Sequence, residues 1–235
     1  MSAFEDLAFT VDKFSGMARL FPLPSLVLFP HVMQPLHIFE PRYRDMLEDA
    51  LAGDRLVAMA LLAPGWESDY EGRPDIHPVA CLGRITTYFR LADGTYNVLL
   101  LGLRRVKLLG EIQSGRRFRK AWVEIREDHY PPQEIGDYDL LYGQLRRAFL
   151  QILPFLPEAQ EQFDQFSGTD VSLGMLTDII SYMLDIDLGK KQSLLAEIDV
   201  YRRAELLLKH LAAAANGLDE DGSQYLSFPP SFSAN

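Results

Sequence analysis

Hydrophobic positions follow two different periods along the chain, and the change of period separates a β-rich part from a helical part. Between residues 18 and 132, short apolar runs alternate with polar residues or are bounded by glycine, proline and aspartate, which predicts strands. Between residues 137 and 217, apolar residues recur every three or four positions, which predicts helices. We therefore expect an α+β protein with a β-rich subdomain at 18–132 and a helical subdomain at 137–217. Residues 1–17 predict a loosely held lead-in, and residues 218–235 a flexible polar tail.

Four prolines interrupt the stretch from Leu20 to Phe39, so it cannot form one continuous strand. Each proline fixes φ at about −65° and lacks an N–H donor, which predicts short extended pieces joined by bends. Pro41 then suits the first turn of a helix, and apolar residues recur at helical spacing as far as Ala52. Gly53 follows at the position where a left-handed glycine commonly ends a helix.

The next segments predict closely spaced strands. Arg55–Leu62 is a continuous apolar run, and the glycine- and proline-rich residues 63–78 after it predict a loop. Asp93-Gly94 is a strong hairpin signal between two further apolar segments. Hairpin-linked strands at this spacing predict antiparallel pairing, in a barrel or a strongly curled sheet. The strands expected from Val79 onward are 79–91, TYNVLLL from Thr95, LRRVKLLGEI after Gly102, and Phe118–Ile125.

Four helical segments are expected in the second half. The first carries apolar residues from Leu141 to Ile152 and is stopped by Pro154. The second spans Leu173–Leu184, with Asp170 or Ser172 as its cap. The last two are a short helix at Lys190–Glu197 and one that Asp199 caps, which runs to about Asn216 with Gly217 as its stop.

Composition limits the classes of function. The chain of 235 residues has one cysteine, Cys81, which excludes an internal disulfide and fits a reducing compartment. No signal-peptide pattern and no apolar run long enough to span a bilayer is found in the sequence, so a cytoplasmic location without membrane contact is expected. The net charge of −10 argues against general nucleic-acid binding. Basic residues nevertheless gather between Arg84 and Lys120.

Catalytic motifs are missing from the sequence. It contains no nucleotide-binding P-loop, no G-x-S-x-G elbow, no H-E-x-x-H and no G-x-G-x-x-G. The five histidines lack ligand-like spacing, and Cys81 lies in an apolar run typical of a core residue. We therefore expect no catalytic residues, no metal and no cofactor.

Three stretches, in order along the chain, resemble one known family. FPL-x-x-LVLFP followed by PLHIFEPRYR covers residues 21–44, and VACLGRITTYFRLADGTYNVLLLGLRRVKLL covers residues 79–109. The third, LTDIISYMLDIDLGKKQSLLAEIDVYRRAELLLKHL, covers residues 176–211. Together they resemble the amino-terminal, substrate-binding domain of Lon proteases, and are closest in wording to its free-standing members.

This resemblance implies both a fold and a function. It implies a PUA-like antiparallel β pseudo-barrel with a short helix, followed by a carboxy-terminal helical bundle. It also implies a non-catalytic module without the ATPase and peptidase parts of Lon. Such a module binds exposed or unfolded segments of partner proteins and is linked to proteolysis. The sequence does not decide the oligomeric state or whether a separate protease takes part.

The candidate binding residues lie in the proline-rich stretch and at the start of the helix after it. One interpretation is structural, with the aromatic side chains in the core and the charged ones paired locally. The other is that this corner docks an extended segment, because guanidinium groups suit carboxylates and carbonyls. The candidates are Phe29, Pro30, Phe39, Glu40, Arg42, Tyr43 and Arg44.

The alternative function is a small RNA-binding module that uses the basic segment. Its structural counterpart is a set of solvated strand faces, and fold analogy alone is weak support for a ligand. RNA binding would weaken steeply with salt and would be lost on charge reversal at Arg104 and Arg105. The residues of this alternative face are Arg104, Arg105, Lys107, Arg117, Arg119 and Lys120.

Overall fold

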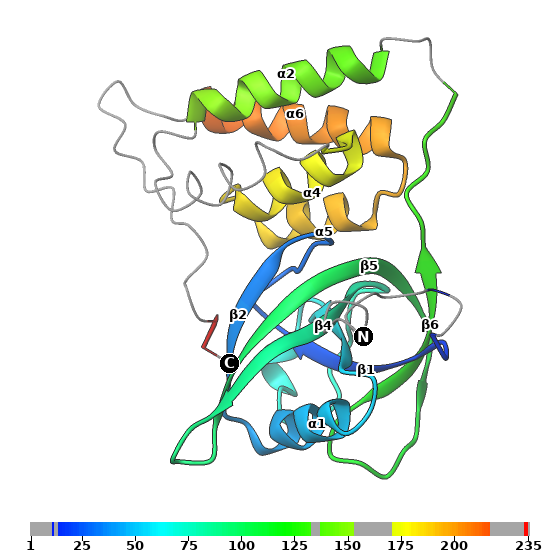
Figure 1. Ribbon diagram of the computed structural model, residues 1–235, viewed down its shortest axis with the longest axis vertical. Coiled ribbons are helices and arrows are strands. Elements are labelled where there is room, and N and C mark those ends of the chain that lie inside the picture. The colour runs from blue at the N-terminus through cyan, green and yellow to red at the C-terminus, as the bar shows by residue number, and fades with distance from the viewer. Residues whose placement is uncertain (1–10, 12–13, 133–136, 153–170, 217–232, 235) are drawn as a thin grey trace, which may run out of the picture. The chain divides into compact units, whose positions relative to one another are not determined.

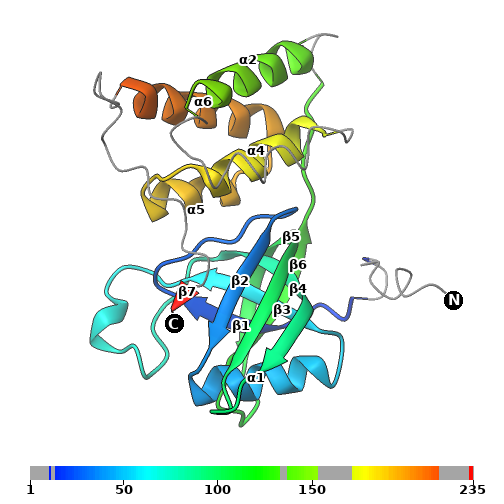
Figure 2. The same cartoon turned by 60° about the vertical axis from the view of Figure 1, so that its left-hand side comes forward.

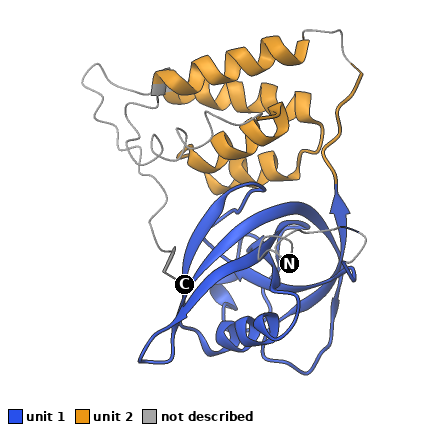
Figure 3. Cartoon of the chain, viewed as in Figure 1, with its two compact units in different colours: residues 1–126, 231–235 blue, residues 127–230 orange. Residues whose placement is uncertain are grey.

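The computed structural model describes residues 11, 14–132, 137–152, 171–216 and 233–234. The chain forms two compact units, which Figure 3 colours separately. The first unit comprises residues 1–126 with 231–235, and the second comprises residues 127–230. Residues 127–132 therefore belong to the helical unit, whereas the β-rich subdomain was predicted to extend to residue 132.

The first unit is built on one mixed sheet (Figure 1). Its neighbours run in the order β4-β3-β1-β6-β5-β2-β7, and β4 also pairs with β5. Because β4 also pairs with β5, the strands β4, β3, β1, β6 and β5 close into a ring of five. This ring confirms the predicted pseudo-barrel. The strands are β1 (Met17–Leu23), β2 (Met33–Ile38), β3 (Leu56–Leu61), β4 (Val79–Arg90), β5 (Tyr96–Ile112), β6 (Lys120–Arg126) and β7 (Ser233–Ala234).

Small residues fill the interior of the ring. Alternate residues of β1, β3, β4, β5 and β6 point inward, as expected for a small barrel whose interior holds only side chains. Alanines on four of these strands leave room for the larger leucines and valines of their neighbours. The cluster consists of Ala18, Leu20, Leu56, Ala58, Ala60, Ala80, Leu82, Val106, Ala121 and Val123.

Two strand pairs, β1–β3 and β2–β7, are parallel, whereas antiparallel pairing was predicted from the sequence. β1 and β3 run parallel, with Arg19 opposite Val57 and Leu23 opposite Leu61. A hairpin cannot join parallel strands, and here the connection passes through β2 and the helix α1 (Pro41–Leu51). The sheet is therefore mixed, because a crossover connection joins β1 to β3.

The two strands predicted on either side of Gly102 form the single long strand β5. Gly102 lies at a register shift opposite β4, so an irregularity is absorbed inside the strand. A Cβ atom at Gly102 would overlap with the carbonyl oxygen of Phe29, so only glycine permits this close approach. The glycine thus makes room for the proline-rich stretch and does not end the strand.

The helix α1 begins at Pro41 as predicted, but it does not end on a left-handed Gly53. The N–H groups of Ala52 and Gly53 donate to Glu48 and Ala50, and the positive φ of 59° falls on Arg55. Arg19 of β1 holds the end of this helix, because its Nε lies 2.6 Å from Asp49 Oδ2 and its Nη1 2.6 Å from Asp54 Oδ1.

The second unit is a helical bundle, as predicted. Its helices are α2 (Asp137–Ile152), α4 (Leu173–Met183), α5 (Leu188–Ala196) and α6 (Val200–Asn216). Ser172 caps α4 by accepting from the Met175 N–H, and Asp199 accepts from the Arg202 N–H at the start of α6. Asp187 caps α5, which begins two residues before the predicted start at Lys190. The predicted helix stops at Pro154 and Gly217, the alternative cap Asp170 and most of the terminal segments lie outside the described residues.

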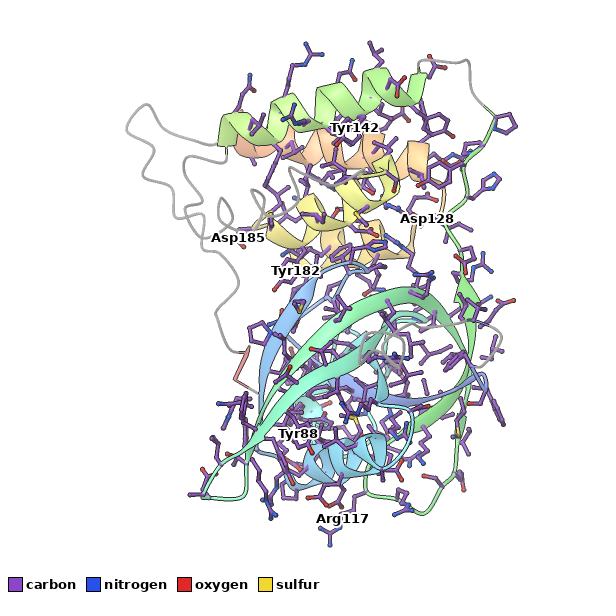
Figure 4. All side chains as sticks on the ribbon, viewed as in Figure 1. Tyr88, Arg117, Asp128, Tyr142, Tyr182 and Asp185 are labelled. Atoms are coloured by element: carbon purple, nitrogen blue, oxygen red, sulfur yellow. The ribbon has the colours of Figure 1, made fainter. Side chains whose placement is uncertain are left out.

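A fully buried arginine, Arg203, links the helices to residues 127–132. Its guanidinium donates to both carboxylate oxygens of Asp128, at 2.9 and 2.6 Å, and to Thr177 Oγ1 at 2.9 Å. Figure 4 labels Asp128 beside these helices. A buried charge needs such a complete set of partners, since an uncompensated one costs several kcal/mol. This set of bonds explains why residues 127–132 pack with the helical unit.

A second buried cation, Lys191, lies on α5. Its Nζ donates to the Tyr182 carbonyl oxygen at 2.9 Å. Burial lowers the pKa of Lys191 to about 8, and the negative charge of Asp185 opposes this shift. The folded state therefore binds the Lys191 proton less tightly than the unfolded chain does.

We predict that Lys191 makes the stability of the helical unit increase with pH. Between the folded pKa of about 8 and the unfolded value of 10.5, the unfolded chain binds more protons, so the free energy of unfolding rises with pH. From pH 7 to 9.5 the contribution is at most about 2 kcal/mol. Lys191→Met should remove this rise in urea unfolding followed by helical circular dichroism. Lys190→Met, its exposed neighbour, should retain it, and equal pH profiles for both variants would contradict the assignment.

Candidate functional site

The start of α1 carries a compact group of charged and aromatic side chains, here called the Arg42 cluster: Glu40, Arg42, Tyr43 and Tyr70. The Arg42 guanidinium lies 4.7 Å from the ring centroids of both tyrosines. Its Nε donates to Glu40 Oε2 at 2.9 Å, and its Nη1 to the Tyr70 carbonyl oxygen at 3.0 Å. The Tyr70 hydroxyl donates to Glu40 Oε1 at 2.7 Å. The cluster therefore fastens the loop of residues 63–78 to the helix.

Electrostatics keep the tyrosines of this cluster neutral. Burial raises the pKa of Tyr43, whose hydroxyl donates to the Pro22 carbonyl oxygen at 2.8 Å. Burial also raises the pKa of Tyr70, and its hydrogen bond to Glu40 adds to this effect. Both hydroxyls thus act as hydrogen-bond donors inside the protein.

The other candidates of the proline-rich stretch occupy different environments. Phe29 and Pro30 are buried, whereas Phe39 is 42% exposed. Arg44 donates through Nη1 to the Gly94 carbonyl oxygen at 3.2 Å, at the β4–β5 hairpin. Of the seven predicted residues, Phe39 is the one with a largely exposed apolar side chain, so a contact with a partner would rest on it.

Several basic side chains of this segment are buried or lie close to a carboxylate. Arg105 and Arg119 are buried, and Arg119 pairs with Glu111 and donates to the Pro74 carbonyl oxygen at 2.8 Å. Lys120 Nζ lies 3.2 Å from Asp49 Oδ2. Arg104 is half-buried and Lys107 is exposed. Arg117 extends away from the ribbon (Figure 4), with Asp45 at 3.8 Å.

Strand pairing places a set of apolar side chains on the outward side of β2, β5 and β4, three strands that lie side by side in Figure 1. Opposite residues of antiparallel strands share one side of a sheet. Met33 is opposite Leu101, and Pro35 is opposite Leu99 on the same outward side. Phe89 of β4 joins them opposite Asn97, and Phe39 stacks on His37 with ring centroids 6.0 Å apart. We call the outer face the set Met33, Pro35, Phe39, Phe89, Leu99 and Leu101.

The outer face is the feature that sequence analysis missed, except for Phe39. Phe89 is 67% exposed and Met33 50% exposed, and the strand register places both on the same side of the sheet. The sequence NVLLL in β5 is apolar at four successive positions and so does not distinguish its two sides, whereas in the structure Val98 and Leu100 are buried and Leu99 and Leu101 are half-buried. The pairing of β2 with β5 could not be derived from that pattern, so the neighbours across the strands stayed unknown.

Neither metal-binding nor membrane-spanning features emerge from the residues that the structure describes. Among them, no three histidine, cysteine or acidic side chains come close enough together to hold a metal ion. Within the same part of the chain, every helix is too short or too polar to cross a bilayer.

The family becomes clear from comparison with known proteins. Residues 17–213 match the family model described as the ATP-dependent protease La (LON) substrate-binding domain. The chain belongs to the Lon substrate-binding domain family. The matched residues include parts of both units. The match confirms the resemblance found at the proline-rich stretch, the β4–β5 hairpin and the helices.

Curated relatives of this Lon-type domain are much longer proteins. The Lon protease of Heliobacterium modesticaldum is 29% identical over 194 residues, which cover 82% of this chain and 23% of that protein. The Lon protease of Xanthomonas oryzae is 28% identical over 188 residues, covering 80% of this chain and 22% of that protein. The chain thus spans about a quarter of the length of the curated relatives it matches.

Solved structures of Lon amino-terminal domains share its fold. A Lon N-terminal domain protein from Xanthomonas campestris is 23% identical, with a TM-score of 0.59 and coverage of 82% of this chain and 97% of that one. The N-terminal domain of Mycobacterium avium complex Lon protease is 16% identical, with a TM-score of 0.63 and coverage of 83% and 98%. The α+β fold of the Lon-type domain is therefore confirmed.

We predict that Arg42→Gln releases the loop of residues 63–78. The variant loses two cation–π contacts and its bonds to Glu40 and the Tyr70 carbonyl, a loss of about 1–3 kcal/mol in local stability. Amide hydrogen exchange at Asp69 and Gly72, which donate within this loop, should become about tenfold faster or more. Arg44→Gln is the control and should leave exchange there unchanged. Equal acceleration by both variants would show that the cluster does not hold the loop.

Proposed function

We propose that this Lon-type domain is a non-catalytic binding protein for exposed apolar segments of unfolded polypeptides. The observation that carries the proposal is the outer face, where Met33 and Phe39 at the two ends of β2 and Phe89 of β4 expose large apolar side chains on either side of β5. Apolar patches of this kind mark sites of protein–protein contact. Family membership supports the same class of ligand, because the family is described as substrate-binding.

The chemistry of the outer face suits an unfolded client better than a nucleic acid. Several cations of the basic segment are buried or lie near carboxylates, which reduces the positive potential that RNA binding needs. The outer face instead offers aliphatic, thioether and aromatic groups, and methionine adapts to varied apolar partners. Clients of different sequence could therefore bind the outer face without sharing a fixed pattern of charges.

We further propose a link to proteolysis. The matched curated relatives are Lon proteases, and this chain corresponds to about a quarter of their length. In this proposal, the domain holds an exposed segment and presents it to a separate protease. The cytoplasmic location stays a prediction from the sequence.

Polar substitution of the outer face should weaken client binding. For Phe89→Ser combined with Met33→Ser, we expect at least tenfold weaker binding, because each buried large apolar side chain contributes about 1.5–3 kcal/mol. The measurement is fluorescence anisotropy with a labelled, reduced and carboxymethylated lysozyme, which stays unfolded because its thiols are blocked.

Leu109→Ser is the matched control, since Leu109 of β5 is 62% exposed and lies outside the outer face. It should bind the probe as the wild type does. Equal loss in both variants, or unchanged binding after the double substitution, would place the contact elsewhere. Binding by no variant, wild type included, would exclude the proposed function.

A further inference from the structure

The edge of β2 that faces away from β5 is already used for strand pairing by the chain itself. β7, two residues near the carboxy terminus, pairs with β2 in parallel, with Leu36 opposite Ser233 and His37 opposite Ala234. Figure 2 shows β7 beside β2. The ring of five strands has no place for a further strand on β5, because β5 pairs with β2, β4 and β6. The edge of β2 therefore accepts an extended segment from elsewhere in the chain.

The main chain of β2 explains why pairing occurs at His37. The Gly102 N–H donates to the Val32 carbonyl oxygen at 2.9 Å, and hydrogen-bonded pairs alternate along antiparallel strands. This alternation turns the main-chain groups of Met33, Pro35 and His37 away from β5. Pro35 has no N–H, and its carbonyl accepts from the Gln34 side chain at 2.8 Å. His37 is left with both a donor and an acceptor at the point where β7 pairs.

This edge continues directly into the outer face. His37 Nδ1 lies 2.8 Å from Asn97 Oδ1, and the His37 ring stacks on the ring of Phe39. A segment added beside His37 would place alternate side chains next to Phe39 and Met33. Main-chain bonds and apolar contacts would then come from one continuous surface.

We propose that a client polypeptide binds by adding as a parallel strand to the edge of β2 at His37, and that Ser233–Ala234 occupies this edge until a client displaces it. The inference rests on the proposed function and names the site and mode of binding for it. Strand addition suits an unfolded client, because main-chain hydrogen bonds do not depend on its sequence. The tethered segment competes as an intramolecular ligand, and it covers an edge that would otherwise promote association between copies.

The first experiment removes the competitor without shortening the chain. Proline donates no main-chain hydrogen bond, so Ser233→Pro with Ala234→Pro should break the β2–β7 pairing. Binding of the carboxymethylated lysozyme probe should tighten by about three- to tenfold. Amide exchange at His37, followed by NMR, should become faster in the free variant and slow again on addition of probe. Ser233→Ala with Ala234→Ser keeps both donors and should match the wild type.

The second experiment alters the edge itself with a matched pair. His37→Pro removes the side chain and the outward N–H, whereas His37→Ala removes the side chain alone. In the Ser233→Pro, Ala234→Pro background, where the tail does not compete for the same edge, we expect His37→Pro to weaken probe binding about fivefold relative to His37→Ala, because one main-chain hydrogen bond contributes about 1 kcal/mol. Circular dichroism of both variants checks that the fold is retained.

The outcomes separate the two proposals. Probe binding that is equal in His37→Pro and His37→Ala, with no tightening in the tail variant, would overturn strand addition and leave binding by the outer face intact. Unchanged exchange at His37 in the tail variant would overturn occupancy by Ser233–Ala234. Absence of probe binding in every variant would overturn both client strand addition and the proposed function.

Discussion

The β unit depends on main-chain pairing along β5, the strand of residues Tyr96–Ile112. This strand pairs with β4 along most of its length, with β6 at its second half and with β2 at its first half. Its pairing with β4 closes the ring around the barrel core, and Phe14 and Ile76 from outside the strands pack against that core. Because β2 then lies beyond the ring, its other edge and the outer face are left for contacts with an additional segment. The same pairing therefore produces both the stability of the unit and the surface that we propose for binding.

Charged side chains in this protein serve mainly to hold the fold together. Arg42 fastens a loop to α1, Arg19 holds the end of the same helix, and Arg203 joins the helices to residues 127–132. Each guanidinium is shielded and has several acceptors, as the cost of burying a charge requires. The surface that we propose for partner binding combines the apolar side chains of the outer face with the polar main-chain groups at the edge of β2. That combination suits a client recognised by being extended and apolar.

Much of the fold could be predicted from local patterns. Pro41, Ser172 and Asp199 marked helix starts, and Asp93-Gly94 marked the hairpin, because their effects act within a few residues. The parallel pairing of β1 with β3 and the continuity of β5 through Gly102 were not predictable in this way. Both depend on residues far apart in the chain, such as Phe29 packing against Gly102. For the site, the sequence offered the motif around Arg42 as a candidate, whereas the outer face depends on the register of β2 against β5 and could not be read from local patterns.

Site-specific photo-cross-linking tests the central claim most directly, namely that an unfolded polypeptide lies along the outer face beside β2. A benzophenone amino acid would be placed singly at Met33, Phe39, Phe89, Leu109 or Trp122, all of which are exposed. The account predicts adducts with an unfolded protein at positions 33, 39 and 89 and few at 109 and 122. Adducts concentrated at 109 and 122, or spread evenly over all five positions, would contradict it.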